Sequence, residues 1–243
     1  MRKNNRKKKW ICLLAFGVCL AGIFLILCCP KGEPVTKEQL DSLPLDGIEH
    51  LMIIAHPDDE TFWGGAHLLK EKYFVVCLTN GTSNTRKQEF IKAVTLTGSI
   101  PFILNYPDRQ FGIRSHWFGH EKRIQKDINV LLSYRDWKQI VTHNPDGEYG
   151  HIHHKKTSKF VTRALKEKTK LFYFGIYYSE DFLKNNINQT IEPILEEELQ
   201  KKMQLVKCYT SQEKAVRLFS HMFPYENWIP EKEWKNGKQK EIN

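Results

Sequence analysis

Outside its first thirty residues the chain contains little cysteine. Four of the six cysteines lie between residues 10 and 29, and only Cys77 and Cys208 remain beyond them. These two provide neither a framework of several disulfides nor a C-x-x-C metal motif. The sequence therefore excludes disulfide-stapled scaffolds and closed zinc sites built from paired cysteines. Stability has to come from a core, which the remaining length of about 200 residues allows.

The chain also lacks a distributed basic surface. The formal net charge is +9, but six Lys or Arg residues and no acids lie within residues 1–9. The excess of positive charge is mostly a local feature of the N-terminus, and no nucleic-acid-binding motif accompanies it. We predict that nucleic acid is not a partner.

An uncharged apolar run follows this basic flank. Residues 10–29 read WICLLAFGVCLAGIFLILCC, which as a helix is long enough to span a bilayer. The run is longer than the apolar part of a cleavable signal peptide and ends without an A-x-A site. Acylation at Cys28 or Cys29 fits poorly, because Leu27 stands where a small residue is usual. We predict an uncleaved, single-pass transmembrane anchor.

The flanking charges predict the orientation of this anchor. Basic residues are retained on the cytoplasmic side of membranes, so residues 1–9 form a cytoplasmic flank and the domain lies outside the cytoplasm. Residues 30–47 contain three prolines and two glycines with little apolar periodicity, which is typical of a linker. The domain then occupies residues 48–243.

Short apolar runs alternate with amphipathic ones along the domain. We predict strands at 51–56, 74–80, 102–106, 139–144 and 171–178, and helices at 65–72, 86–97, 120–134, 154–166, 192–206 and 213–223. This alternation indicates an α/β fold, a Rossmann-like and mostly parallel sheet with helices on both faces. Such sheets bind ligands beyond the carboxyl ends of their strands, where the strand order reverses.

Metal-binding residue types gather after two of the predicted strands. A-H-P-D-D-E at residues 55–60 follows the first strand, and residues 142–154, which contain four histidines, follow the fourth. Neighbouring carboxylates repel one another and are costly to bury without a cation. Two histidines and a carboxylate with an open position are typical of a catalytic zinc site. If the two strands are neighbours, both segments face one crevice and form a metal site.

These two motifs carry a resemblance to a known family. The chain resembles the GlcNAc-phosphatidylinositol de-N-acetylases, the PIG-L-type or LmbE-like zinc deacetylases, whose hallmarks match residues 55–60 and the H-x-x-H at 151–154. Residues 79–81 with Arg86 and Glu89, and the loop at 106–108, extend the similarity over roughly 48–180. The resemblance implies a Rossmann-like fold, Zn²⁺, and removal of an N-acetyl group from a glucosamine-type sugar.

The resemblance also implies roles for individual residues. His56, Asp59 and His154 would hold the metal. Asp58 would be the general base for a zinc-activated water, and His151 would stabilise the oxyanion or protonate the leaving amine.

Several alternatives remain open at the level of sequence. His153 adds a third histidine to the pair, so that His153 or His151 could be the metal ligand in place of His154, and His143 is expected in a pocket wall or the core. Arg86 and Asp108 are expected to contact substrate, or else to be a surface arginine and a turn carboxylate, and Trp63 is expected at the pocket mouth.

The function predicted from the sequence is de-N-acetylation of an N-acetylated sugar, glycolipid or cell-envelope glycan. Two alternatives are a catalytically idle carbohydrate-binding protein on the same fold and a zinc amidase that acts on a non-sugar amide.

Overall fold

The structure, a computed structural model, describes residues 16, 32–110, 112–186 and 192–237. The predicted basic flank over 1–9 and, apart from Phe16, the predicted anchor over 10–29 lie outside these residues. Among the described residues, no helix is both long and apolar enough to cross a bilayer.

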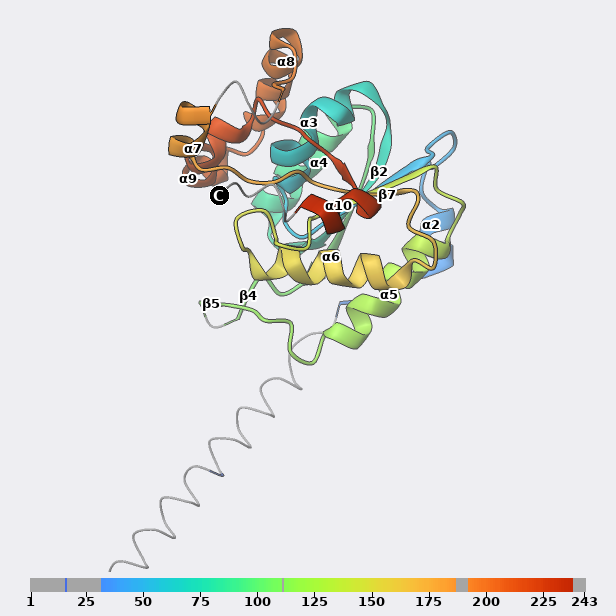
Figure 1. Cartoon of the computed structure of the whole chain (residues 1–243). Coiled ribbons are helices and arrows are strands. Elements are labelled where there is room, and N and C mark those ends of the chain that lie inside the picture. The colour runs from blue at the N-terminus through green and yellow to red at the C-terminus, as the bar shows by residue number, and fades with distance from the viewer. Residues whose placement is uncertain (1–15, 17–31, 111, 187–191, 238–243) are drawn as a thin grey trace, which may run out of the picture.

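A six-stranded sheet forms the centre of the domain, in the order β3-β2-β1-β6-β7-β8 (Figure 1). Neighbouring strands are parallel except β8, which runs antiparallel to β7. The strands are β1 (His50–Ile54), β2 (Tyr73–Thr79), β3 (Ile100–Tyr106), β6 (Gln139–Thr142), β7 (Leu171–Tyr173) and β8 (Ile229–Pro230). The predicted α/β class and mostly parallel sheet are confirmed.

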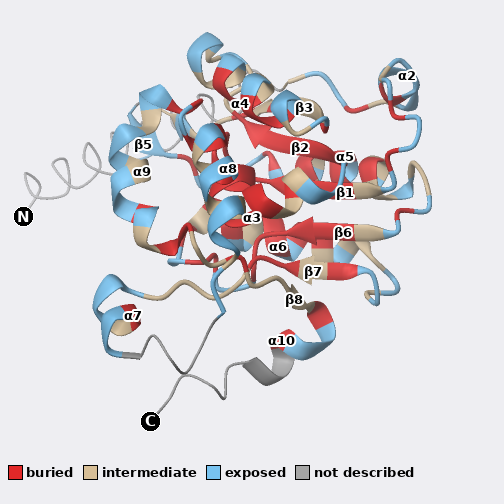
Figure 2. Ribbon diagram, turned by 90° about the horizontal axis from the view of Figure 1, so that it is seen from above, coloured by how far each residue is buried: buried red, intermediate tan, exposed pale blue. Residues whose placement is uncertain are grey.

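Helices cover both faces of this sheet (Figure 2). One face carries α3 (Asp59–Lys70), α4 (Asn84–Leu96), α8 (Glu196–Val206) and α9 (Glu213–Phe219); the other carries α2 (Lys37–Asp41), α5 (Glu121–Ser133) and α6 (Ile152–Ala164). Shorter elements are the β4 (Arg109–Gln110) and β5 (Ile113–Arg114) hairpin, α7 (Glu180–Asn186), η1 (Thr210–Gln212), η2 (Ser220–Met222) and α10 (Glu231–Gly237).

The apolar run in β1 explains the two-sided core. Leu51 and Ile53 point into the cluster that contains α5 and α6, whereas Met52 and Ile54 point into the cluster that contains α3 and α8. All four side chains are fully buried. Successive strand residues face opposite sides, so a strand covered on both faces is apolar throughout rather than alternating.

The strand order reverses beside β1. The chain moves outward from β1 through β2 to β3, then returns through α5 to place β6 on the other side of β1. His50 to Ile53 of β1 pair with Gln139 to Thr142 of β6. The segments that follow β1 and β6 therefore leave the same edge of the sheet side by side, at the crevice where such folds bind ligands.

Helix α3 begins earlier than predicted. It starts at Asp59, within the acidic motif, rather than at residue 65. Gly64 and Gly65 lie inside the helix, where neighbouring side chains pack closely against them. A Cβ atom on Gly64 would lie 2.8 Å from the Trp228 ring, and one on Gly65 would lie 3.0 Å from Lys202. Carboxylates in a first helical turn are favoured by the helix dipole.

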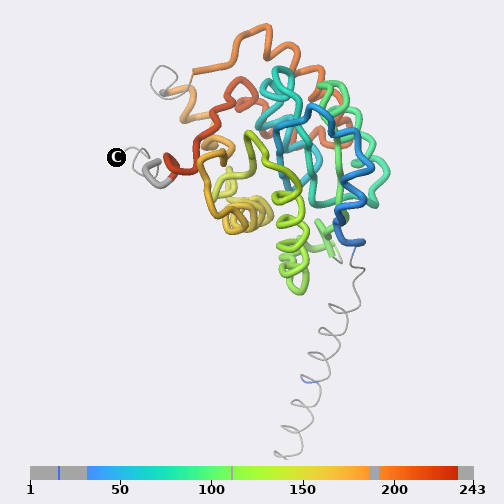
Figure 3. The backbone as a smooth tube through the Cα atoms, turned by 90° about the vertical axis from the view of Figure 1, so that its right-hand side faces the viewer, coloured from blue at the N-terminus to red at the C-terminus, as the bar shows by residue number. Residues whose placement is uncertain are grey.

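The predicted linker over 30–47 also differs from the structure. Residues 36–41 form a capping box and α2, and Val35, Leu40 and Leu45 are buried in the core beside α5. The three apolar residues are five positions apart, a spacing that fits neither the period of a helix nor that of a strand, so a periodicity analysis does not reveal their burial. Figure 3 shows this blue first part of the described chain beside the green segment that follows β3. The domain core thus extends to about residue 35.

A buried ion pair connects α8 and the loop before β8 to α3. Lys202 on α8 lies 2.7 Å from Glu226, and neither side chain is exposed. The Lys202 ammonium also donates to the carbonyls of Phe62 and Phe223, at 2.9 and 3.0 Å, while Glu226 accepts the Ala66 amide at 2.8 Å. Burial raises the pKa of a carboxyl group, but Lys202, His67 and the Ala66 amide together outweigh that effect, and the pKa of Glu226 falls to about 2.

Removing one member of this pair is expected to destabilise the protein strongly. Glu226→Ala leaves the Lys202 charge buried without its counter-ion, which typically costs about 3–5 kcal/mol. The free energy of unfolding from urea titration measures the loss. Glu213→Ala, which removes an exposed partner of Arg217, is the control and should cost less than about 1 kcal/mol. Equal losses in both variants would contradict the assignment.

Candidate metal centre and its surroundings

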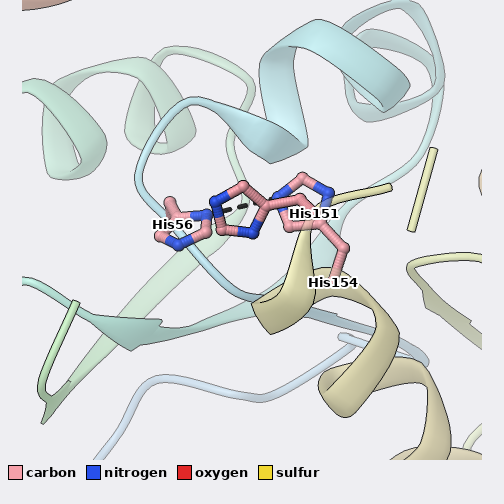
Figure 4. Close-up of side chains that lie close together, drawn as sticks. All are labelled: His56, His151 and His154. Carbon is pink, nitrogen blue, oxygen red and sulfur yellow. Dashed lines mark hydrogen bonds between the residues drawn. The ribbon is translucent and has the colours of Figure 1, made fainter. Parts of the chain in front are cut away.

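Two segments bring the predicted site residues together at the switch point. His56 and Asp58 lie in the turn between β1 and α3, Asp59 is the first residue of α3, and His151 and His154 lie at the start of α6. Figure 4 shows the rings of His56, His151 and His154 gathered in front of these elements. All five residues are buried, with His154 completely so.

Donor atoms of the three predicted ligands lie close together, with Asp59 facing the two histidines through its two different oxygens. We call this group of ligand atoms the triangle. His56 Nδ1 lies 3.2 Å from His154 Nε2 and 3.3 Å from an Asp59 carboxylate oxygen, and His154 Nε2 lies 3.3 Å from the other Asp59 oxygen. Tetrahedral zinc with bonds of about 2.0–2.1 Å separates its ligand atoms by about 3.3–3.4 Å. The triangle has the dimensions of three corners of a zinc site, so these residues fit the ion.

A buried carboxylate behind His154 orients this ligand. Glu148 accepts a short hydrogen bond from His154 Nδ1 and another, of 3.0 Å, from His143 Nδ1. Burial raises the pKa of a carboxyl group, but His143 and His154 outweigh it and lower the pKa of Glu148 to about 2. With Nδ1 donating to Glu148, the Nε2 lone pair of His154 faces the triangle. This is the carboxylate–histidine arrangement found behind metal ligands.

His153 orients the ring of His56 in a similar way. Its Nε2 lies 2.6 Å from the Ser115 carbonyl, which only accepts, so the proton sits on Nε2. Burial, aided by His56, lowers the pKa of His153 to about 3, so the ring is neutral. Its Nδ1 therefore accepts from His56 Nε2 at 2.9 Å, which leaves His56 Nδ1 free for the metal. Both nitrogens of His153 are thus occupied away from the triangle.

His143 lies next to the triangle, but hydrogen bonds occupy both of its nitrogens as well. Its Nε2 accepts the Ala55 amide at 3.0 Å, and its Nδ1 faces Glu148. The ring stacks on His154 with centroids 3.8 Å apart and is completely buried. Metal-capable donors form three overlapping groups among the described residues: His56, His151 and His154; His56, Asp108 and His153; and Asp59, His143 and His154. None of these groups contains His56, Asp59 and His154 together, and His143 Nε2 also lies 3.3 Å from Asp59. The family resemblance and the hydrogen bonds that orient His56 and His154 favour these three as the ligand set.

Asp58 adopts a strained backbone conformation beside the triangle. Its φ of 117° lies in a region that side chains rarely adopt. The Arg86 guanidinium lies 3.1 Å from the Asp58 carboxylate and also donates a short hydrogen bond to the Pro57 carbonyl. Burial raises the pKa of Asp58 well above its usual range; Asp59 adds to this rise, and Arg86 opposes it.

His151 presents one nitrogen to the pocket. Its Nδ1 accepts the His153 amide at 3.2 Å as the N-cap of α6. Burial, with His154 and His56 nearby, lowers the pKa of His151 well below its usual value. The neutral ring therefore carries its proton on Nε2. This ring lies edge-on to His56, with centroids 4.6 Å apart.

A cavity of about 250 Å³ opens over these residues. His56, Asp58, Asp59 and His151 line it, as do the three softer sequence predictions, Trp63, Arg86 and Asp108. Arg86 reaches the cavity while paired with Asp58, so it is not a free surface arginine. Asp108 lies 3.5 Å from His56 Nε2 and 3.6 Å from His153 Nδ1, on the side of His56 away from the triangle. Trp63 is 4% exposed, so it forms part of the wall of the cavity and does not lie at its mouth.

The sequence prediction missed four residues of this region. Tyr149, Arg114 and Phe219 line the cavity, and Glu148 supports His154. Glu148 and Tyr149 lie within the histidine-rich segment, so their position was a usable signal. Arg114 in β5 and Phe219 at the end of α9 come from distant elements and carried no such signal.

Glu148→Gln is expected to weaken metal binding about 10–100-fold, the usual effect of losing such a supporting carboxylate. Glu148 offers two oxygens to three donors, since its other oxygen accepts the Asn144 amide at 3.0 Å. Glutamine has a single acceptor oxygen. Competition titration with a chromogenic zinc chelator measures the affinity. Glu121→Gln, at an exposed carboxylate paired with Lys156, should bind zinc like the wild type.

Comparisons with known proteins agree with this geometry. A family model described as GlcNAc-PI de-N-acetylase matches residues 51–165, which include both segments of the candidate metal centre. The chain is also 32% identical over 186 residues to an uncharacterised protein, L374, of Acanthamoeba polyphaga mimivirus, covering 70% of this chain and 74% of that protein. This chain therefore belongs to the GlcNAc-PI de-N-acetylase family.

Proposed function

We propose that this protein is a zinc-dependent hydrolase that removes an N-acetyl group from an N-acetylglucosamine-type sugar or glycoconjugate. The observation that carries the proposal is the triangle of His56, Asp59 and His154 donor atoms, 3.2–3.3 Å apart, beside Asp58 in an open cavity. Membership of the family supports the deacetylase activity.

Zinc held by this triangle would polarise the acetamide carbonyl and lower the pKa of a water molecule towards about 7. The residues of the chain then transfer protons and stabilise the charges that form. Asp58 accepts the proton of the attacking water, and its raised pKa suits a group that has to hold a proton for part of the cycle. Arg86 holds the Asp58 carboxylate in place.

His151 faces the other side of the reacting carbonyl. Its Nε2–H is available to the cavity because Nδ1 already accepts the His153 amide. This N–H would donate a hydrogen bond to the oxyanion as the carbonyl becomes tetrahedral. Because the ring is neutral, the leaving amine would receive the proton that Asp58 took from water, and His151 would keep its own. A cavity of about 250 Å³ accommodates a single amino-sugar ring.

Acetate release from a panel of N-acetylated substrates tests the proposal. The panel contains N-acetylglucosamine, its glycosides, chitin oligosaccharides, a glycolipid and N-acetylated short peptides. Release from the sugars by zinc-loaded protein supports the proposed function. Release from the peptides alone supports a non-sugar amidase. Zinc binding with no release from any substrate supports an idle binding protein.

We further propose that residues 10–29 anchor the protein in a membrane, with the N-terminus in the cytoplasm and the domain outside it. The support is the uncharged length of this run and its six basic flanking residues. Gly32 lies beside Asn105, and its carbonyl accepts from Arg123 at 3.1 Å. The segment that leads to such an anchor would join the domain at the edge of the sheet that carries the cavity. A glycoconjugate of the membrane or cell envelope would then be the nearest substrate.

Protease protection in intact cells tests the orientation. A domain outside the cytoplasm is digested by external protease, and one inside is shielded. Flotation of the full chain with vesicles, and its loss on deletion of residues 10–29, tests the anchor itself.

A further inference from the structure

A tyrosine from the C-terminal part of the chain reaches the acidic motif. Tyr209 follows α8 and lies beyond residue 165, where the match to the family model ends. Its side chain is 1% exposed, and its hydroxyl donates a short hydrogen bond to Glu60 Oε1. Glu60 directly follows the predicted ligand Asp59 but does not face the metal triangle. The mechanism described above uses neither Glu60 nor Tyr209.

Glu60 is a completely buried carboxylate with a defined set of donors. Oε1 also accepts from the Thr61 hydroxyl at 2.6 Å, and Oε2 accepts the backbone amide of Asp58 at 3.2 Å. The Tyr209 hydroxyl therefore holds one oxygen while the other holds Asp58. A carboxylate without such partners would reorient or take up water, because a buried acceptor is costly to leave unsatisfied.

These contacts lead from Tyr209 through Glu60 to Asp58, the residue with the strained backbone. Asp58 keeps its φ of 117° only if surrounding contacts fix it, since such a conformation is strained for a residue with a side chain. Glu60 fixes its backbone amide, and Arg86 fixes its carboxylate. Glu60 and Arg86 thus both hold Asp58, one at its backbone and one at its side chain. The contact from Glu60 depends on the position of the Glu60 carboxylate.

We propose that Tyr209 is a positioning residue that holds Asp58 in its working conformation through Glu60. The proposal rests on the proposed function, in which Asp58 is the general base. It assigns the segment after α8 a part in catalysis although that segment contributes no metal ligand. A general base misplaced by about 1 Å loses about 100-fold in rate, so the contact matters even at a distance from substrate.

The competing explanation is that Tyr209 only packs the core. Its ring forms a small cluster with Ala93 and Cys208 and lies edge-on to Phe62, with centroids 6.3 Å apart. Tyr209→Phe separates the two explanations, because it keeps the ring and removes only the hydroxyl. Tyr73→Phe is the matched control. Tyr73 is also 1% exposed, and its hydroxyl donates to Gln139 at 2.7 Å, at the opposite end of the strands.

The experiment compares both variants with wild type as full-length, zinc-loaded protein. For Tyr209→Phe we expect kcat for acetate release to fall about 10–100-fold, with KM and bound zinc unchanged. Hydrogen–deuterium exchange should quicken in the peptide that covers residues 55–62 and stay unchanged in peptides of α5 and α6. Tyr73→Phe should match wild type in kcat and in exchange over 55–62.

Three results would overturn the proposal: a kcat for Tyr209→Phe within twofold of that for Tyr73→Phe, a loss of zinc that accounts for the lost activity, or unchanged exchange over 55–62. If wild type releases acetate from no substrate, the proposed function fails. The exchange comparison then decides alone whether Tyr209 holds the Asp58 segment.

Discussion

Asp58→Asn is expected to lower kcat for acetate release by about 10²–10⁴-fold, the usual contribution of a positioned general base. Asparagine has nearly the same shape and tolerates positive φ better than most residues, but its amide cannot take a proton from water. The variant should retain its zinc, because the triangle of His56, Asp59 and His154 does not include Asp58. A coupled acetate assay and metal analysis of the same preparation measure both quantities.

Asp46→Asn is the control for this substitution, because Asp46 is exposed and precedes the amino end of β1, whereas the motif follows its carboxyl end. It should match wild type in both measurements. If Asp58→Asn retains more than about a tenth of the wild-type kcat, another group is the base. If it loses its zinc, Asp58 belongs to the ligand set instead.

Removal of the metal is expected to have the second large effect. A chelator should bring wild-type activity to background, and added zinc should restore it. His154→Ala should lack zinc at micromolar concentrations and should not recover, because a buried ligand and its support from Glu148 are lost together. The ion contributes several kcal/mol of transition-state stabilisation, which corresponds to about 10²–10⁴ in rate or more.

His116→Ala provides the comparison for His154→Ala. His116 is exposed and forms no part of the metal-capable groups. It should bind zinc and release acetate at the wild-type rate. Full activity of wild type in the presence of excess chelator, with metal analysis showing no zinc, would contradict the metal-dependent mechanism.

The sheet was predictable because its strands are apolar on both faces. Runs such as residues 51–54 leave few alternatives to a buried parallel strand, and the rule for ligand sites then locates the edge to search. The grouping of His56, Asp59 and His154 followed from this rule and from the family resemblance. Strand ends were less certain: β7 ends at Tyr173, well before the predicted 178, because the aromatic residues beyond it pack as a loop.

The supporting residues were harder to predict. Glu148 looks in sequence like a solvated turn residue. It is buried because a loop with φ of 50° at Glu148, held by the Asn144 side chain, turns its carboxylate inward. The contact between Tyr209 and Glu60 joins residues far apart in the chain. No periodicity or local motif encodes such a contact, because it arises only when α8 packs on α3.

The backbone of Asp58 has a consequence for the evolution and engineering of this protein. Glycine adopts a φ of 117° without strain, so Asp58→Gly would relieve a local cost and remove a buried charge. Asp58→Gly would also leave the Arg86 guanidinium without its carboxylate, so the gain in stability requires that Arg86 be neutralised as well. Such a pair of substitutions would relieve the backbone strain and end catalysis, and selection for activity acts against it. Position 58 marks a trade-off between stability and activity.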